Sequence, residues 1–218
     1  MALLHKAEIR PSKLELLDGW AQSQPWFVGD PDRGLSQVGA FRFDDPEGEV
    51  GVETLLVRAA EGPILQVPVT YRDAPLQAAD AWLIGTMDHS VLGKRWVYDG
   101  VGDPVYLLTA ATAAITGGRQ AEMFIEIDGE MVRREPTALV AGSVVEGSAL
   151  PTLPAVEEIS VRHEAGTTVV DTGLLHIVIS RVLDGTDLPT GSDSAEGVLS
   201  GTWAGQTEPR RLVVASVG

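Results

Sequence analysis

The stretch from Ala81-Trp82-Leu83-Ile84-Gly85 through Trp96-Val97-Tyr98-Asp99-Gly100 to Asp103-Pro104 predicts two strands, a tight turn and the start of a helix. Asp caps helix N-termini well, and Pro fits the first helical position, where its missing N–H is not needed. The helix that follows is apolar on nearly every side until Gly117-Gly118 ends it. Such a helix must lie between other elements, so the rest of the chain is expected to pack around it.

This helix is expected to form the centre of the core. We expect it to be buried together with the two aromatic residues of the preceding strand. The predicted buried group is Trp96, Tyr98, Leu107, Leu108, Ala111 and Ile115.

A second helix is predicted near the N-terminus, because Ser12 and Glu15 form a capping box and an apolar stripe follows at helical spacing. Pro25 is expected to end it. The remaining N-terminal segments alternate as strands do. They cover residues 3–9, 37–43, 52–60, 64–72, 82–87 and 95–99. Pro68 lies inside one of these strands and cannot donate to a ladder, so it is expected at an edge or a bulge.

After residue 118 the pattern predicts strands only. They cover residues 123–127, 130–134, 137–145, 159–163, 167–171, 174–183, 198–204 and 211–217. Asp128-Gly129 is typical of a two-residue hairpin turn. Residues 146–154 are the best candidate linker, and residues 184–197 read as a polar loop. Two helices among many short strands indicate an α+β protein with mainly antiparallel sheet.

The composition excludes several classes of function. The chain has 218 residues, no Cys, and a formal net charge of -15. Disulfides and thiolate chemistry are therefore excluded. The acidic surface disfavours nucleic acid and anionic membranes as partners, because both are recognised by Lys and Arg. We expect neither a signal peptide nor a membrane span, since no apolar run approaches roughly 20 residues. A cytoplasmic location is the resulting expectation.

Motifs for common chemistry are not found. The sequence contains no P-loop, no Gly-x-Gly-x-x-Gly and no Gly-x-Ser-x-Gly elbow. No two of the four histidines have helical metal-ligand spacing, so neither a metal nor a cofactor is predicted. His176 is expected to be half-exposed on a sheet. The acidic clusters lie in Gly/Pro-rich loops and are interpreted as solvated.

A few residues remain as candidates for ligand binding. Trp20, Trp82 and Trp96 sit in apolar patterns and are expected in the core, whereas Trp26 follows a proline and precedes a turn, so it is expected to be the most exposed tryptophan. Asp88, His89 and Ser90 combine three catalytic residue types, but neighbours in a loop favour a turn over a triad. The candidate ligand-binding residues are Trp26, Asp30, Asp88 and His89; no catalytic residue is predicted.

Three stretches resemble the N-terminal cap domain of bacterial maltokinases and the related actinobacterial glucosamine kinases. They are Leu14 to Gly29 with Trp26-Phe27-Val28-Gly29, then Gln66-Val67-Pro68-Val69 with Tyr71-Arg72 and Pro75-Leu76, and finally Leu83-Ile84-Gly85 with Trp96-Val97-Tyr98-Asp99 and Asp103-Pro104. The resemblance implies a curved antiparallel sheet with two helices, like that of cystatins. Where the family typically has Arg before Trp-Phe and Lys after the Gly, this chain has Pro25 and Asp30.

The resemblance also implies a role. In the kinases, a phosphotransferase-like region follows the cap, but here no His-x-Asp loop or helical lobe is found after residue 118. We expect a free-standing cap-like region at residues 1–120 and a β-rich region at residues 121–218, packed as one body. The first hypothesis is a non-catalytic binding or regulatory protein linked to maltose, trehalose or glycogen metabolism. Its partner would be a kinase or glucan-metabolism enzyme, or a sugar. The alternative is a sugar-binding protein or an unrecognised enzyme with a pocket between the two regions.

Overall fold

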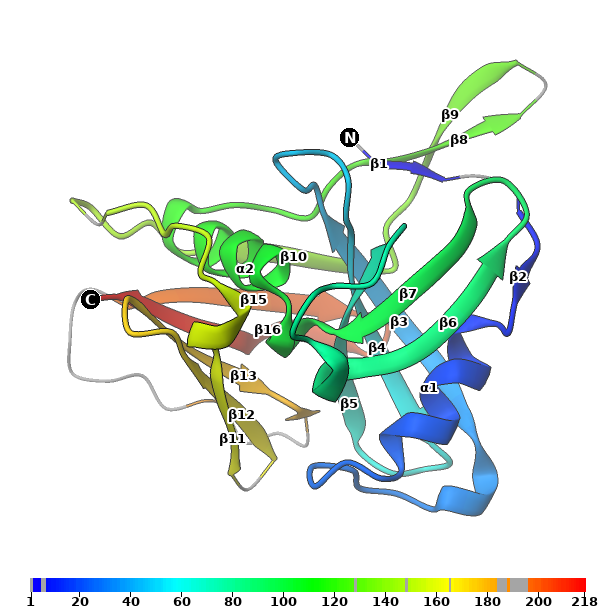
Figure 1. Ribbon diagram of the computed structural model, residues 1–218, viewed down its shortest axis with the longest axis horizontal. Helices are drawn as coiled ribbons and strands as arrows, with labels where there is room; N and C mark the ends of the chain where they lie inside the picture. Colours follow the sequence, from blue (N-terminus) through cyan, green and yellow to red (C-terminus); the bar gives the residue numbers. More distant parts are fainter. Residues whose placement is uncertain are drawn as a thin grey trace.

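The computed structural model describes residues 2–4, 7–127, 129–147, 149–164, 166–183, 188 and 196–218, with side chains from residue 7 onward (Figure 1). Most of the predicted loop at residues 184–197 lies outside the described residues. Within the described residues the helices are α1 (Lys13–Ala21) and α2 (Pro104–Thr116), with short 3-10 segments η1 (Pro31–Arg33), η2 (Asp80–Trp82), η3 (Gly100–Gly102) and η4 (Val156–Glu158).

The strands follow the predicted pattern closely. They are β1 (Ala2–Leu4), β2 (Ile9–Arg10), β3 (Leu35–Phe43), β4 (Gly51–Ala59), β5 (Ile64–Arg72), β6 (Leu83–His89), β7 (Gly93–Asp99), β8 (Met123–Ile127), β9 (Glu130–Arg134), β10 (Ala138–Gly142), β11 (Ser160–Glu164), β12 (Thr167–Asp171), β13 (Leu175–Ser180), β14 (Val182–Leu183), β15 (Gly197–Trp203) and β16 (Gln206–Val217). The single strand predicted at residues 3–9 is divided into β1 and β2. The predicted α+β class is confirmed.

The first sheet is antiparallel and curls into a half-barrel, with the strand order β2-β6-β7-β5-β4-β3 (Figure 1). β14 adds to one end of β5, where it pairs with Ile64 and Leu65. β7 pairs with β5 only from Val69 onward. Pro68 therefore occupies the gap between these two partners, where no N–H is needed, although β5 itself is a central strand.

The second sheet, also antiparallel, has the order β10-β15-β16-β13-β12-β11 and contains the strands predicted after residue 137. A smaller sheet joins β1 to the β8–β9 hairpin, and its β1–β8 pairing is parallel. In Figure 1 this hairpin projects away from the two larger sheets. Beyond α2, the part of the chain that the structure describes consists of strands, loops and the short η4 segment.

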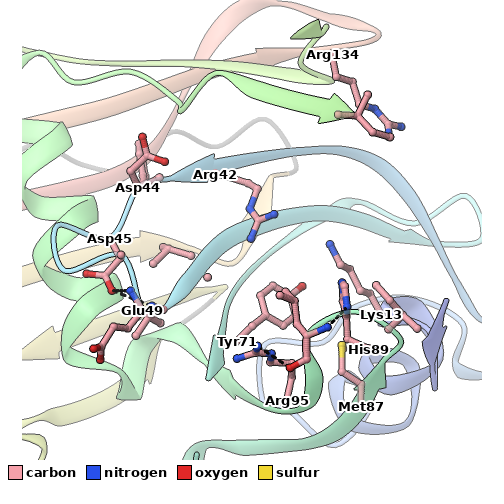
Figure 2. Close-up of a pocket in the computed structure, with 18 residues that line it drawn as sticks. Lys13, Arg42, Asp44, Asp45, Glu49, Tyr71, Met87, His89, Arg95 and Arg134 are labelled. Carbon is pink, nitrogen blue, oxygen red and sulfur yellow. Dashed lines mark hydrogen bonds between the residues drawn. The ribbon is translucent and has the colours of Figure 1, made fainter. Parts of the chain in front are cut away.

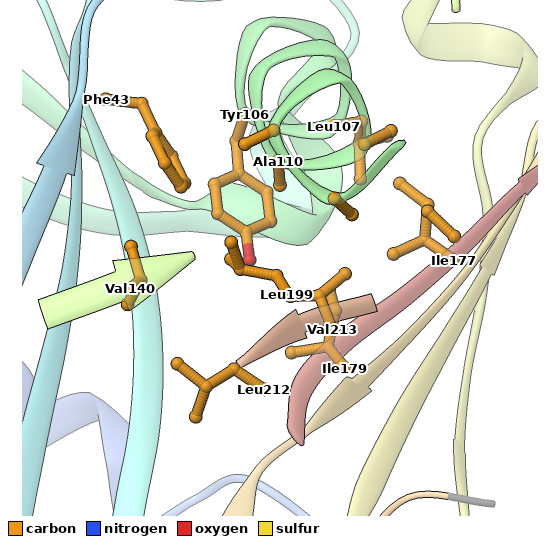
Figure 3. Packing of buried hydrophobic residues seen from close by; sticks show 14 of the residues in the cluster. Phe43, Tyr106, Leu107, Ala110, Val140, Ile177, Ile179, Leu199, Leu212 and Val213 are labelled. Atoms are coloured by element: carbon orange, nitrogen blue, oxygen red, sulfur yellow. The ribbon is translucent and has the colours of Figure 1, made fainter. Parts of the chain in front are cut away.

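Helix α2 lies between the sheets, packed on β10, β15 and β16 of the second sheet and on β5 of the first (Figure 3). One buried cluster joins all three layers: Phe43 on β3, Leu107 on α2 and Ile177 on β13 belong to it. Figure 3 shows the Tyr106 ring entering this cluster from the helix. The helix is apolar on nearly every side because it meets apolar neighbours on more than one face, as predicted.

The opposite face of the first sheet is covered by α1. Ser12 accepts a hydrogen bond from the Glu15 N–H, and the Glu15 carboxylate accepts one from the Ser12 N–H, so the predicted capping box is present. Leu17 and Ala21 then pack with Leu55 and Val67 in a second buried cluster. The helix ends at Ala21, before Pro25. β4 and β5 contribute to both clusters, which explains why both strands are buried along most of their length.

The Asp103 side chain connects the start of α2 to β5. Its carboxylate, fully buried, accepts the Val105 N–H at 3.0 Å and so caps α2 as predicted. It also accepts two hydrogen bonds from the Arg72 guanidinium, both at 2.7 Å, and one from the Thr70 hydroxyl at 2.6 Å. A buried carboxylate is stable only when its oxygens are satisfied in this way. The start of α2 is therefore locked to β5.

The predicted core around this stretch is correct for most of its members. Leu107, Ala111 and Ile115 share one buried cluster, and Tyr98 is 1% exposed. The prediction that Trp96 is buried is wrong, because its side chain is only partly buried and has the Lys94 ammonium 5.1 Å from its ring centroid. Leu108 is likewise only partly buried. Trp96 and Tyr98 occupy alternate positions of β7 and share a face, but Trp96 lies in the middle of the strand, two residues farther along the chain from α2 than Tyr98.

Candidate functional site

A cleft of about 640 Å³ opens on the first sheet, between the loop after β3 and the β6–β7 hairpin (Figure 2). We term it the Arg42 cleft. Its lining residues are Ile9, Lys13, Arg42, Phe43, Asp44, Asp45, Gly48, Glu49, Val50, Gly51, Val52, Tyr71, Met87, His89, Leu92, Arg95, Ile125 and Arg134. Ile125 and Arg134 come from the projecting β8–β9 hairpin, so both regions of the chain contribute.

One wall of the cleft is an acidic loop. The Asp45 carboxylate accepts hydrogen bonds from the backbone N–H groups of Glu47, Glu49 and Val50, at 3.1, 3.0 and 2.8 Å. These bonds are local, and Asp is favoured in turns because it can make them. They hold the loop in shape and place Asp44 and Glu49 on the same side of the cleft (Figure 2).

Lys13 and Tyr71 of the lining belong to a buried ionic group. Glu53, 6% exposed, accepts hydrogen bonds from the Lys13 ammonium at 2.5 Å and from the Tyr71 hydroxyl at 2.7 Å. Burial by itself would raise the pKa of Glu53, but the positive charges of Lys13 and Arg42 outweigh it, and the pKa is lowered. Burial, and then the Glu53 charge, raise the pKa of Tyr71 well above its ordinary value. Glu53 therefore stays ionised and Tyr71 stays protonated at neutral pH.

Gly51 leaves room for this arrangement. A Cβ atom at position 51 would lie 3.1 Å from an Arg42 Nη atom and 3.2 Å from Cδ2 of Tyr71. Both distances are shorter than ordinary van der Waals contact, so a side chain here would displace the Arg42 guanidinium. Because glycine has no Cβ atom, this part of the cleft stays open.

His89 is the one predicted site residue that lines the cleft. Its Nδ1 accepts the Leu92 N–H at 3.0 Å and the Val91 N–H at 3.3 Å, which closes the β6–β7 turn. Since Nδ1 is the acceptor, the proton of the neutral ring resides on Nε2. Asp88, its neighbour, is exposed on β6 and opposite Lys94, outside the cleft lining.

The prediction that Trp26 is the most exposed tryptophan is also wrong, because its side chain is buried and only 2% exposed. Its ring lies 5.7 Å from that of Trp20 and has the Arg181 guanidinium 4.8 Å from its centroid. A covered ring offers no face on which a sugar could stack. Asp30 is exposed; it accepts the Asp32 N–H at 3.1 Å and caps η1, so neither residue lies at the cleft.

The cation over Trp26 belongs to a buried pair between the two regions of the chain. Arg181 is fully buried and donates to Asp99 at 2.6 and 2.9 Å and to the Thr168 hydroxyl at 2.8 Å. Removal of one partner of such a buried pair strongly destabilises a folded protein. Asp99 and Arg72, which both belong to the stretches that resemble the cap, therefore make buried contacts that hold the fold.

His176 behaves as its strand pattern predicts. It lies on β13, its side chain is 43% exposed, and its Nδ1 contacts the Asp171 carboxylate on β12. This contact is the largest cause of the lowered pKa of Asp171. No group of three or more His, Cys, Asp or Glu in metal-binding arrangement occurs among the described side chains.

A second cavity, of about 400 Å³, lies between the β4–β5 turn and the β15–β16 turn. It is lined by Arg58, Glu61, Gly62, Pro63, Ile64, Leu183, Trp203, Ala204, Gly205, Gln206 and Arg210. The Arg58 Nε and Trp203 Nε1 atoms are buried without a hydrogen-bond acceptor in the described structure. This cavity is formed by both sheets.

Residues 20–103 match the family model of the maltokinase N-terminal cap domain. This segment is similar to the maltokinase N-terminal cap domain, and we term it the cap-like domain. The match contains β3 to β7 and ends at Asp103, the residue that caps α2. No curated protein matches the chain. The cap-like domain therefore provides most of the first sheet, and the second sheet lies beyond the matched residues. No described helix is long and apolar enough to cross a membrane.

Within and around the cap-like domain, sequence reasoning missed the basic residues of the cleft. Lys13, Arg42, Arg95 and Arg134 come from α1, β3, β7 and β9. A partial signal exists on β3, where Arg42 alternates with Phe41 and Phe43 and so faces away from their core. Nothing in the sequence indicates that the other three side chains meet it, because the curl of the sheet brings them together.

Proposed function

We propose that this chain is a non-catalytic binding protein of the maltokinase-cap type that acts in the cytoplasm, in maltose, trehalose or glycogen metabolism. Its ligand would be a small sugar held in the Arg42 cleft, and its protein partner a kinase or glucan-metabolism enzyme. The observation that carries the proposal is the cleft itself. It is large enough for a small ligand and combines carboxylate, guanidinium and imidazole groups, which suit the hydroxyls of a sugar.

A binding measurement tests the proposal. Isothermal titration calorimetry and thermal shift are run with maltose, glucosamine, glucose and glucose 6-phosphate. We expect saturable binding of at least one of them, lost in Gly51→Val because the added side chain displaces Arg42. Ser160→Val, on exposed β11, adds similar bulk elsewhere and should bind as the unmodified chain does. Failure of all four compounds to bind would contradict a sugar ligand.

A second assay tests the non-catalytic part. The proposal expects no phosphate transfer from ATP to maltose or glucosamine, since the chain has no recognisable phosphate-cradling loop. Sugar-dependent ATP turnover by the pure chain, abolished by Gly51→Val, would instead identify an enzyme.

The second cavity supports the alternative of a ligand site between the two β regions. Arg58 and Trp203 would be its polar groups, and both carry a buried N–H that has no acceptor among the described residues. The two sites are separable by mutation: sugar binding that survives Gly51→Val but is lost in Arg58→Gln would favour this alternative.

A further inference from the structure

We propose that the Arg42 cleft is specific for a sugar that carries an oxyanion, either a phosphate monoester or a carboxylate. The anion would bind to the guanidinium groups of Arg42 and Arg95, and the sugar hydroxyls would bind to the carboxylate of Glu49. This inference rests on the proposed function and names the ligand class of the same site.

The first observation is that no arginine of the cleft forms an ion pair with a described carboxylate, although Arg42 lies close enough for its charge to lower the pKa of Glu53. Arg95 donates to the Leu92 carbonyl oxygen at 2.8 Å, and no ion pair joins Arg42, Arg95 or Arg134 to a carboxylate among the described side chains. The chain has 31 acidic and 16 basic residues, so an arginine could readily have found an acidic neighbour. Among the basic lining residues, Lys13 does form such an ion pair, with Glu53.

The second observation concerns individual donors. The Nε atoms of Arg42 and Arg95 are both buried, and neither has a hydrogen-bond acceptor within the described structure. A buried N–H without an acceptor is unfavourable, and most such groups in proteins are paired. An oxyanion can accept from Nε and Nη of one guanidinium at once, which is the geometry that arginine offers to phosphate and carboxylate.

The third observation is that acidic and basic side chains lie on different sides of the cleft. In Figure 2 the carboxylates of Asp44, Asp45 and Glu49 lie on one side, Arg95 and His89 lie on the other, and Arg42 lies between them. Asp45 accepts hydrogen bonds from three backbone N–H groups, and Asp44 and Glu49 line the same side of the cleft. A ligand with an anion at one end and hydroxyls at the other would match both walls. A bare anion would use one wall, and a neutral sugar would leave the arginine N–H groups unpaired.

The test compares four probes by calorimetry at low salt: glucose 6-phosphate, glucuronate, glucose and inorganic phosphate. We expect glucose 6-phosphate, glucuronate or both to bind at least about tenfold more tightly than glucose or inorganic phosphate. Glucose lacks the oxyanion that would accept from the arginines, and inorganic phosphate lacks the sugar hydroxyls. Which of the two anionic sugars binds better identifies the oxyanion. Raising the salt to 0.5 M should weaken this binding, since exposed charges are then screened.

Variants locate the site. Arg42→Gln and Arg95→Gln should each weaken binding of the anionic sugar about tenfold or more, with unchanged thermal unfolding confirming the fold. Arg58→Gln is the matched control, because its Nε is also buried and unpaired but lines the other cavity.

The outcomes separate this inference from the proposed function. Equal binding of glucose and glucose 6-phosphate, insensitive to Arg42→Gln, would overturn the inference and leave a sugar-binding function intact. Inorganic phosphate that binds as tightly as the anionic sugars would overturn the sugar part. Absence of binding by every sugar would overturn both.

Discussion

Trp26 and Trp96 differ in what covers their rings. Trp26 packs against Trp20 and Arg181 and is almost fully buried, whereas Trp96 is partly exposed beside Lys94. We predict that Trp26→Ala lowers the free energy of unfolding by about 3–5 kcal/mol, the usual loss for a buried large aromatic side chain. Trp96→Ala should lower it by less, because part of its surface is already hydrated.

Urea denaturation followed by circular dichroism measures both values on the same scale. An equal loss in the two variants, or a larger loss for Trp96→Ala, would contradict the burial seen in the structure. The order of the two losses is the decisive quantity, since the energy of each depends on how far the site relaxes.

Glu53 gives a prediction about pH. Its pKa is lowered in the folded chain, so it contributes stability above its unfolded pKa, and that contribution is lost as pH falls through the folded value. We predict that Glu53→Gln is less stable than the unmodified chain at pH 6–7 and that the difference shrinks below about pH 4. Urea denaturation at several pH values between 3 and 7 measures it.

The control for Glu53 is Glu47→Gln. Glu47 is exposed in the loop after β3, so its replacement should change stability little at any pH. A stability difference for Glu53→Gln that grows as pH falls would contradict the direction of the pKa shift.

At the scale of elements, the contact between α2 and the second sheet depends on glycine. A Cβ atom at Gly142 on β10 would lie 1.8 Å from the Ala113 carbonyl oxygen of α2, which is impossible without movement of the helix. We predict that Gly142→Ala destabilises the chain by about 1–3 kcal/mol or more, as overpacking does. Thermal and urea unfolding measure the change.

Gly19 in α1 is the matched control, because a Cβ atom there would meet nothing within 4 Å. Alanine is the better helix former, so Gly19→Ala should raise stability by about 0.5–1 kcal/mol. The two substitutions are chemically identical and should have opposite signs. Loss of stability in both, or in neither, would show that the approach of α2 to β10 is wrong.

At the scale of the whole molecule, the buried cluster around α2 takes residues from both β regions. Residues 149–154 lie between β10 and η4, with Leu150 and Leu153 exposed at 66% and 57%. We predict that a protease site inserted after Leu150 can be cut without separating the fragments, because Phe43, Leu107 and Ile177 pack in one cluster. The nicked chain should elute as one species in gel filtration and separate only in denaturant. Two folded fragments that elute apart would contradict a single body.

Much of the local structure could be read from the sequence. The capping box at Ser12 and Glu15, the Asp103 cap and the end of α2 near Gly117 are interactions between near neighbours, so short-range chemistry determines them. The hairpin of β8 and β9 and the period-2 strands of the C-terminal half are determined in the same way. The α+β class and the likeness to the maltokinase cap rest on these local patterns.

The candidate site was decided by tertiary structure. Trp26 is buried because Arg181, far along the chain, closes over its ring, and no pattern near Pro25 records that contact. Lys13, Arg42, Arg95 and Arg134 form one cleft because the first sheet curls and the β8–β9 hairpin reaches its edge. Periodicity tells which face of a strand a side chain takes, but the partner across that face depends on sheet curvature and on contacts between distant segments.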